Sequence, residues 1–288
     1  MDRDQKWYED QFWHWMDVLT VEETFDEKWR RMSAGYIPRA RMERDIKYGN
    51  GANEVFDLFI PDDGESVPVL IFVHGGYWTW MDKDTYAFSL EPIRSAGALV
   101  ASVNYTLCPH NTISGIVDQV RRACIFIYEN VGAYNGDQNN IHITGHSAGG
   151  HLTAMMAATD WRELNPDLPI DLLKSAIPSS GLFDMNNMRL TPQLNEHLKL
   201  DREEADANSP LFLAPAYDMP ISVVVGAEET EGFLLESKNF SKAWSDRVTN
   251  LRYMEVPRVH HFSLIENMLT PGDPFTCLLL EHLGLDGP

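Results

Sequence analysis

A serine framed by glycines, at the end of an apolar run, is the feature that most constrains how this chain can fold. The β-branched run from Ile141 to Thr144 leads directly into Gly145-His146-Ser147-Ala148-Gly149, and an apolar helical stretch follows from Leu152 to Ala158. A turn from strand to helix here is so sharp that only glycine fits on either side, and it lifts the serine hydroxyl above the sheet edge. The segment therefore predicts a strand, a tight turn and a helix, with Ser147 as a nucleophile.

Short β-branched runs alternate with helical stretches from about residue 55 onward. This rhythm is typical of a largely parallel sheet covered by helices on both faces. The helical pattern from Ile113 to Val131 has one apolar face that can pack on such a sheet. The predicted strands are Val55–Ile60, Val69–Val73, Leu99–Val103, Ile141–Thr144, Lys174–Ile177, Ile221–Val225 and Leu251–Val256. We expect residues 1–288 to form a single α/β domain.

Two segments interrupt the alternation of strands and helices. Residues 1–48 are rich in charged and aromatic side chains, and residues 183–216 break the rhythm in mid-chain. Ligands of such sheets bind beyond the carboxyl ends of the strands, so segments that pack over that edge shape the pocket. We expect residues 183–216 to form a cap and residues 1–48 to form an extension that contributes to a lid. The alternative for residues 1–48 is that they only cover a face of the sheet.

A pair of glycines follows another buried strand. The run Val69–Val73 ends in His74-Gly75-Gly76-Tyr77-Trp78. Paired glycines let main-chain N–H groups face a cavity, and such groups form the oxyanion hole of acyl-transfer enzymes together with the N–H after the nucleophile. We expect Gly76, Tyr77 and Ala148 to supply these donors. His74 is expected to support the loop by hydrogen bonding rather than to act as a base.

A serine hydroxyl is a poor nucleophile near neutral pH, so it needs a base and a group that orients that base. Adjacent carboxylates, Glu228 and Glu229, follow the strand that ends near Val225, and His260 and His261 follow the next strand. The order serine, acid, histidine differs from the orders in chymotrypsin and subtilisin. The residues alone leave open which member of each pair faces the site.

Composition excludes several classes of function. The net charge of −20 argues against binding to nucleic acids and to anionic membranes, because both need clustered Lys and Arg. The sequence has no run of roughly 20 apolar residues that would span a bilayer and no secretory signal. Its three cysteines, Cys108, Cys124 and Cys277, form no motif for a disulfide framework or zinc. We expect a cytoplasmic protein that needs no metal or cofactor and binds a small molecule; a homodimer stays open.

At this point the sequence resembles the kynurenine formamidase (arylformamidase) family of α/β-hydrolases. The matching stretches are His74–Trp78, Asn104–Pro109, Gly145–Leu152, Ser180–Asp184, Ser209–Pro210, Val225–Glu229 and His261–Glu266. The resemblance implies the α/β-hydrolase fold and assigns the acid to Glu229 and the base to His261. It has two departures. Animal members of the family use aspartate as the acid, whereas a glutamate such as Glu229 resembles the bacterial-type branch. His260 occupies a place often held by a small or acidic residue.

Three functions are compatible with these residues. The resemblance favours a serine hydrolase that forms an acyl-enzyme on Ser147 and cleaves an aryl formamide such as N-formylkynurenine, a reaction of tryptophan catabolism. A carboxylesterase of unknown natural substrate is the main alternative, and a non-catalytic ligand-binding relative is the remote one, because such relatives typically lose a triad member. Trp78 and Trp80 follow the oxyanion loop, and we expect them to bind the aryl group; their alternative role is packing.

Overall fold

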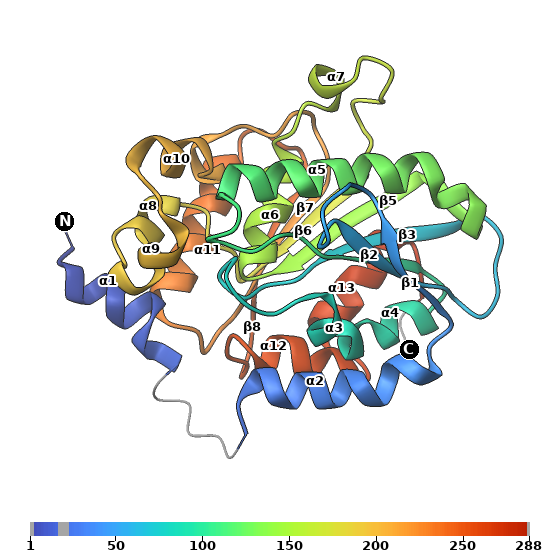
Figure 1. Cartoon of the computed structure of the whole chain (residues 1–288), viewed down its shortest axis with the longest axis horizontal. Coiled ribbons are helices and arrows are strands. Elements are labelled where there is room, and N and C mark those ends of the chain that lie inside the picture. Colours follow the sequence, from blue (N-terminus) through green and yellow to red (C-terminus); the bar gives the residue numbers. More distant parts are fainter. Residues whose placement is uncertain (1–2, 17–22, 287–288) are drawn as a thin grey trace.

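The structure is a computed structural model, and it describes residues 3–16 and 23–286. At its centre lies one mixed β-sheet. Its eight strands lie in the order β1-β2-β4-β3-β5-β6-β7-β8 (Figure 1). They are β1 (Met42–Lys47), β2 (Val55–Phe59), β3 (Val67–Val73), β4 (Leu99–Val103), β5 (Gly136–His146), β6 (Ser175–Ser179), β7 (Ile221–Gly226) and β8 (Leu251–Val256). Neighbours from β4 to β8 pair in parallel, whereas β1 and β2 join antiparallel. The predicted mostly parallel sheet is confirmed.

Helices cover both faces of the sheet, as predicted. Helix α5 packs on α6 and contacts β4 and β5 from one face, while α13 contacts β3 and β5 from the other (Figure 1). The helices are α1 (Gln5–Phe12), α2 (Phe25–Tyr36), α3 (Lys83–Tyr86), α4 (Glu91–Ser95), α5 (Ile113–Asn130), α6 (Ala148–Ala157), α7 (Trp161–Leu164), α8 (Met185–Arg189), α9 (Pro192–Leu198), α10 (Arg202–Ala207), α11 (Glu231–Trp244), α12 (Ser263–Glu266) and α13 (Pro274–Leu283). Short 3₁₀ turns are η1 (His14–Met16), η2 (Ile37–Arg39), η3 (Ala87–Leu90), η4 (Val131–Tyr134), η5 (Pro210–Phe212) and η6 (Asn267–Leu269). Because helices cover both faces of the sheet, strands β2, β4, β6 and β7 are buried along their whole length.

Strand β1 lies inside the segment that was expected to form only an extension. It is an edge strand of charged residues, so its sequence lacks an apolar pattern. Its anchor is the buried carboxylate of Asp57 on β2, which accepts hydrogen bonds from Asp45 N at 2.8 Å and from the buried Lys83 Nζ at 2.9 Å. Burying this ion pair is favourable only because its partners are all in place. Residues 17–22 of the same N-terminal segment lie outside the described residues.

Three short helices, α8, α9 and α10, occupy residues 183–216, where a cap was expected. Helix α8 contacts α1, so the N-terminal helix and the cap segment lie side by side (Figure 1). The cap segment begins at a buried carboxylate of α11: Glu236 accepts the main-chain N–H groups of Phe183 at 2.7 Å and Asp184 at 3.0 Å. The side-chain amide of Asn187 donates to its other oxygen. Burial outweighs these hydrogen bonds and raises the pKa of Glu236 to about 7.

We expect Glu236→Gln to remove a pH dependence of stability. The pKa of Glu236 in the folded protein, about 7, lies above the ordinary value of 4.5. Between these values the folded chain binds more protons than the unfolded chain, so the free energy of unfolding falls as the pH rises, by roughly 3 kcal/mol in total. Urea unfolding at about pH 5 and about pH 8 measures the change. The exposed Glu203→Gln is the control and should keep the wild-type slope. Equal slopes for wild type and Glu236→Gln would contradict the prediction.

Candidate active site

Ser147 sits in the turn between β5 and α6 in a left-handed backbone conformation, with φ of 59° and ψ of −118°. A Cβ atom on Gly145 would lie 2.4 Å from the carbonyl oxygen of Gly149, and one on Gly149 would lie 1.9 Å from that of Val73. The Ser147 N–H donates to the carbonyl of Ser179 on the adjacent strand at 2.9 Å. The glycines are therefore sterically required, and the turn holds a strained residue of the kind found at functional sites.

Glu229 and His261 meet at the same edge of the sheet. Glu229 follows β7 and His261 follows β8, and Glu229 Oε2 lies 2.7 Å from His261 Nδ1. Because a carboxylate only accepts hydrogen bonds, Nδ1 of His261 carries the proton that it donates to Glu229. Nε2 of the same ring is then left as a hydrogen-bond acceptor. The other carboxylate oxygen accepts the N–H of Gly226 at 2.8 Å and the hydroxyl of Ser180. Ser147 and His261 line one cavity, so the serine, the histidine and the acid come together.

The neighbouring members of the two pairs lie elsewhere. Glu228 is exposed, while Glu229 is buried. His260 is half-buried, its N–H donates to Ser263 Oγ at 2.8 Å, and burial lowers its pKa. The geometry thus separates Glu229 from Glu228 and His261 from His260, a choice that the residues alone left open.

His146 is a buried link between the turn at Ser147 and the loop that contains His261. Its Nε2 donates to the main-chain carbonyl of His261 at 3.0 Å, and its Nδ1 accepts from the Tyr86 hydroxyl at 3.1 Å. Burial and the adjacent His261 hold the pKa of His146 well below its usual range, so the ring is neutral. A neutral ring with both nitrogens engaged fixes the position of the His261 backbone. Sequence reasoning missed this link because it depends on the packing of two loops that are 115 positions apart.

The loop after β3 has an unusual backbone. Gly76, Tyr77 and Trp78 have φ values of 106°, 47° and 58° in succession. A Cβ atom on Gly76 would lie 2.1 Å from the carbonyl oxygen of Trp80, so only glycine fits there. Gly76 and Tyr77 line the cavity that contains Ser147, and Ala148 begins the helix directly after it. The three residues expected to form an oxyanion hole therefore surround the serine.

His74 lies beneath this loop rather than in the cavity. Its Nδ1 donates to the carbonyl of Gly75 at 2.8 Å, and its ring stacks on Tyr105 with centroids 4.2 Å apart. Burial lowers the pKa of His74 to about 4. It supports the loop as a neutral side chain.

The N-terminal segment borders the site. The Trp15 ring packs edge-on against His261 with centroids 5.0 Å apart, and its indole N–H donates to the Tyr77 hydroxyl at 3.2 Å. That hydroxyl donates to the carbonyl of Phe12 at 2.6 Å. The hydroxyl of Thr230, the residue that follows Glu229, donates a hydrogen bond to the main-chain carbonyl of Gln11 at 3.0 Å. The extension therefore contacts the loops that contain His261, Glu229 and Tyr77.

Two hollows with shared lining residues lie near Ser147. The inner cavity beside Ser147 has a volume of only about 10 Å³, enough for about one water molecule. The outer groove has a volume of about 710 Å³ and shares Tyr77 and Trp80 with the inner cavity. It is lined by Trp13, Tyr77, Thr79, Trp80, Leu107, Cys108, Pro109, His110, Leu194 and His197. The hollow at Ser147 is therefore much smaller than the groove.

The two tryptophans expected to bind substrate differ in position. Trp80 lines both hollows and is 37% exposed. Trp78 is fully buried, packs edge-on against His151 at 5.0 Å, and lines neither hollow. Trp80 is therefore accessible from both hollows, and its contact with substrate stays a prediction, whereas Trp78 lies in the core, in agreement with its packing alternative. His110 and His197 were not singled out as groove residues, because only the folded chain brings them together.

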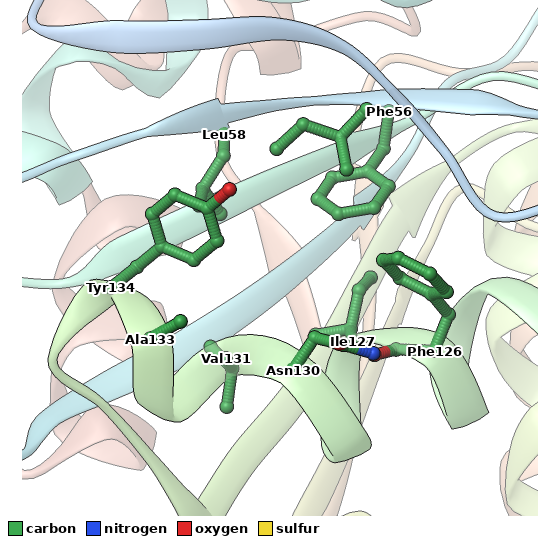
Figure 2. A pocket seen from close by; sticks show the side chains of 9 residues that line it. Phe56, Leu58, Phe126, Ile127, Asn130, Val131, Ala133 and Tyr134 are labelled. Atoms are coloured by element: carbon green, nitrogen blue, oxygen red, sulfur yellow. The ribbon is translucent and has the colours of Figure 1, made fainter.

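A separate apolar hollow lies between the first two strands and the end of α5 (Figure 2). Phe56 and Leu58 face Phe126 and Tyr134 across a space of about 150 Å³. Tyr134 donates its hydroxyl to Glu43 at 2.8 Å, which holds the rim. This hollow shares no lining residue with the two at Ser147.

In residues 3–16 and 23–286, no group of three or more His, Cys, Asp or Glu side chains is placed to hold a metal ion. Within the same ranges, no helix has the length and apolar character needed to cross a membrane.

Comparison with known proteins identifies the family. A family model described as BD-FAE matches residues 56–230. The kynurenine formamidase of Danio rerio is 32% identical over 246 residues, which cover 83% of this chain and 81% of that protein. The esterase LipQ of Mycobacterium tuberculosis is 31% identical over 77% of this chain and 57% of that protein.

Solved structures agree with the fold. A candidate thioesterase from Silicibacter sp. tm1040 superposes with a TM-score of 0.79 and 30% identity, covering 90% of this chain and 94% of that one. An esterase from Pyrobaculum calidifontis superposes with a TM-score of 0.75 at 18% identity, covering 94% and 96%, and supports the fold alone. The resemblance drawn from the motifs is confirmed. The chain belongs to the BD-FAE family and is a hydrolase with the α/β-hydrolase fold.

Proposed function

We propose that the protein is a serine hydrolase that removes a small acyl group from an aryl amine, with N-formylkynurenine as the representative substrate. The observation that carries this proposal is the contrast between the two hollows. Space beside Ser147 suits a formyl group, and the wide groove beyond Trp80 has aromatic walls that suit an aryl amine. The similarity to the kynurenine formamidase of Danio rerio supports the same substrate class.

In the proposed acylation, the Ser147 hydroxyl oxygen attacks the formyl carbon while His261 Nε2 takes the hydroxyl proton. The carbonyl electron pair moves onto oxygen, and the N–H groups of Gly76, Tyr77 and Ala148 hold the resulting oxyanion. When the tetrahedral intermediate collapses, the C–N bond breaks and His261 returns the proton to the leaving amine. The products of this step are a free aryl amine and a formyl ester of Ser147.

In the proposed deacylation, water attacks the formyl ester as His261 accepts one of its protons. Collapse of the second intermediate releases formate and restores the serine hydroxyl. Glu229 keeps the proton of His261 on Nδ1 and stabilises the imidazolium that forms in both steps, which its 2.7 Å bond supports. Three free cysteines support a cytoplasmic location, which we infer as part of this proposal.

A carboxylesterase is the second candidate. The same serine, base and oxyanion donors would cleave an ester, and the similarity to esterase LipQ favours this possibility. The two activities differ in the leaving group: an amine must be protonated as it departs, whereas a phenolate need not be.

The experiment that tests the proposal is steady-state kinetics on N-formyl-L-kynurenine beside p-nitrophenyl acetate. We expect efficient hydrolysis of the formamide, and we expect Ser147→Ala to abolish both activities because the acyl-enzyme cannot form. Hydrolysis of the ester alone would reject the formamidase and leave the carboxylesterase.

The acid is tested by a matched pair of adjacent substitutions. We expect Glu229→Gln to lower kcat by roughly 10⁴-fold, because an amide no longer fixes the imidazole tautomer or stabilises its cation. Glu228→Gln removes the same charge from an exposed neighbour and should retain nearly full activity. Equal losses in the two variants would show that Glu229 is not the orienting group.

The inner cavity predicts a limit on acyl length. We expect kcat/KM for p-nitrophenyl acetate to exceed that for p-nitrophenyl butyrate by roughly tenfold or more, since extra methylenes must displace packed side chains around Ser147. The leaving group is the same in both esters, so their ratio reports the acyl side alone. A ratio near one would mean that the cavity does not select the acyl group.

A further inference from the structure

The outer groove differs in charge from the rest of the molecule. The chain has 43 acidic residues against 23 Lys and Arg, yet no Asp, Glu, Lys or Arg is among the described residues that line this groove. The thiol of Cys108 in its wall stays protonated, because burial raises its pKa to about 12. The Tyr77 hydroxyl is engaged with Phe12 and Trp15. The groove wall therefore presents no negative charge of its own to a ligand.

Two histidines supply ring N–H donors in the described part of this wall. His110 follows β4 in the loop that leads to α5, and His197 belongs to α9 of the cap segment. Both are exposed, so their ring nitrogens are accessible to a bound ligand. Each ring can donate a hydrogen bond whether it is neutral or charged. The groove thus offers donors from two separate segments and has no carboxylate to repel an anion.

The aromatic side chains set where an anionic group would lie. Trp80 stands between the inner cavity and the groove, so an aryl group attached to the scissile nitrogen passes alongside it. Trp13, from the N-terminal segment, lines the same groove. A substituent on the ring then extends toward the remaining polar groups of the wall, among which are His110 and His197.

We infer that His110 and His197 select substrates that carry a carboxylate on the aryl leaving group. This inference rests on the proposed function and deepens it, because it assigns the side chains that recognise the carboxylate of the leaving group. The two histidines donate hydrogen bonds to the carboxylate, while the aryl ring packs against Trp80. An ammonium group on the same substituent finds no carboxylate in the described lining and stays in solvent. The histidines act in specificity, and they take no part in the chemistry at Ser147.

The test uses two formamides that differ only in charge: 4-(2-formamidophenyl)-4-oxobutanoate and the corresponding oxobutanamide. The readout is the ratio of their kcat/KM values, acid over amide. We expect the wild-type enzyme to prefer the acid by roughly tenfold or more, because hydrogen bonds to a charged carboxylate contribute more to binding than hydrogen bonds to a neutral amide. In the double variant His110→Ala and His197→Ala this ratio should fall to near one through a higher KM for the acid. A loss of packing would affect both substrates equally and would leave the ratio unchanged.

Glu196→Gln is the control, because it changes the charge of α9 next to His197 at an exposed side chain that does not line the groove. It should keep the wild-type preference. A double histidine variant with the wild-type ratio, or a wild-type enzyme with no preference for the acid, would overturn the inference.

Failure of the proposed function gives a different pattern. If the wild-type enzyme cleaves p-nitrophenyl acetate but neither formamide, the formamidase is rejected. The same ratio is then measured with 3-(2-acetoxyphenyl)propanoate and its amide. A preference for the acid that the double histidine variant loses supports carboxylate recognition on an esterase, and equal rates for this pair overturn it.

Discussion

The contact on which the site depends is the packing of two backbones against each other without side chains between them. Gly149, in the first turn of α6, lies so close to the end of β3 that an added Cβ would be 1.9 Å from the carbonyl of Val73. Gly75 lies in turn against the carbonyl of His146 and the Cβ of Ser147, which would be 2.7 and 3.1 Å from an added Cβ. Rigid main-chain contact therefore sets the distance between the nucleophile and the loop proposed to hold the oxyanion. Such preorganised groups need no rearrangement during reaction.

The remaining groups are held by hydrogen bonds rather than by steric contact. Each member of the acid and base pair has a partner outside the pair: Glu229 accepts from Gly226 and Ser180, and the carbonyl of His261 accepts from His146. These partners hold the Glu229 carboxylate and the His261 backbone in place. Burial keeps His146 neutral, so its ring places no positive charge beside the His261 ring, whose centroid lies 4.4 Å away.

Much of this architecture could be predicted from the sequence, because its causes are local. Strands buried on both faces are continuous apolar runs, and glycines mark the sharp turn at Ser147. Strand β1 could not be predicted, since its place depends on the buried contact between Asp57 and Lys83, which leaves no apolar pattern. The role of Trp78 was also beyond sequence reasoning. The backbone turns at Trp78, where φ is 58°, and Trp80, two positions later, lines the cavity. The groove histidines, His110 and His197, come from the loop before α5 and from α9. Only the folding of residues 183–216 over the sheet brings these two segments together.

The contacts of the N-terminal segment set the order in which the site can be completed during synthesis. Residues 3–16 are made before Thr230 and His261, yet Gln11 and Trp15 contact those two residues. This segment is therefore synthesised early and can dock only late. Until the ribosome has passed His261, the proposed base is absent and the Trp15 ring lacks this packing partner. A nascent chain that ends before His261 thus lacks both the proposed base and the contact that encloses it.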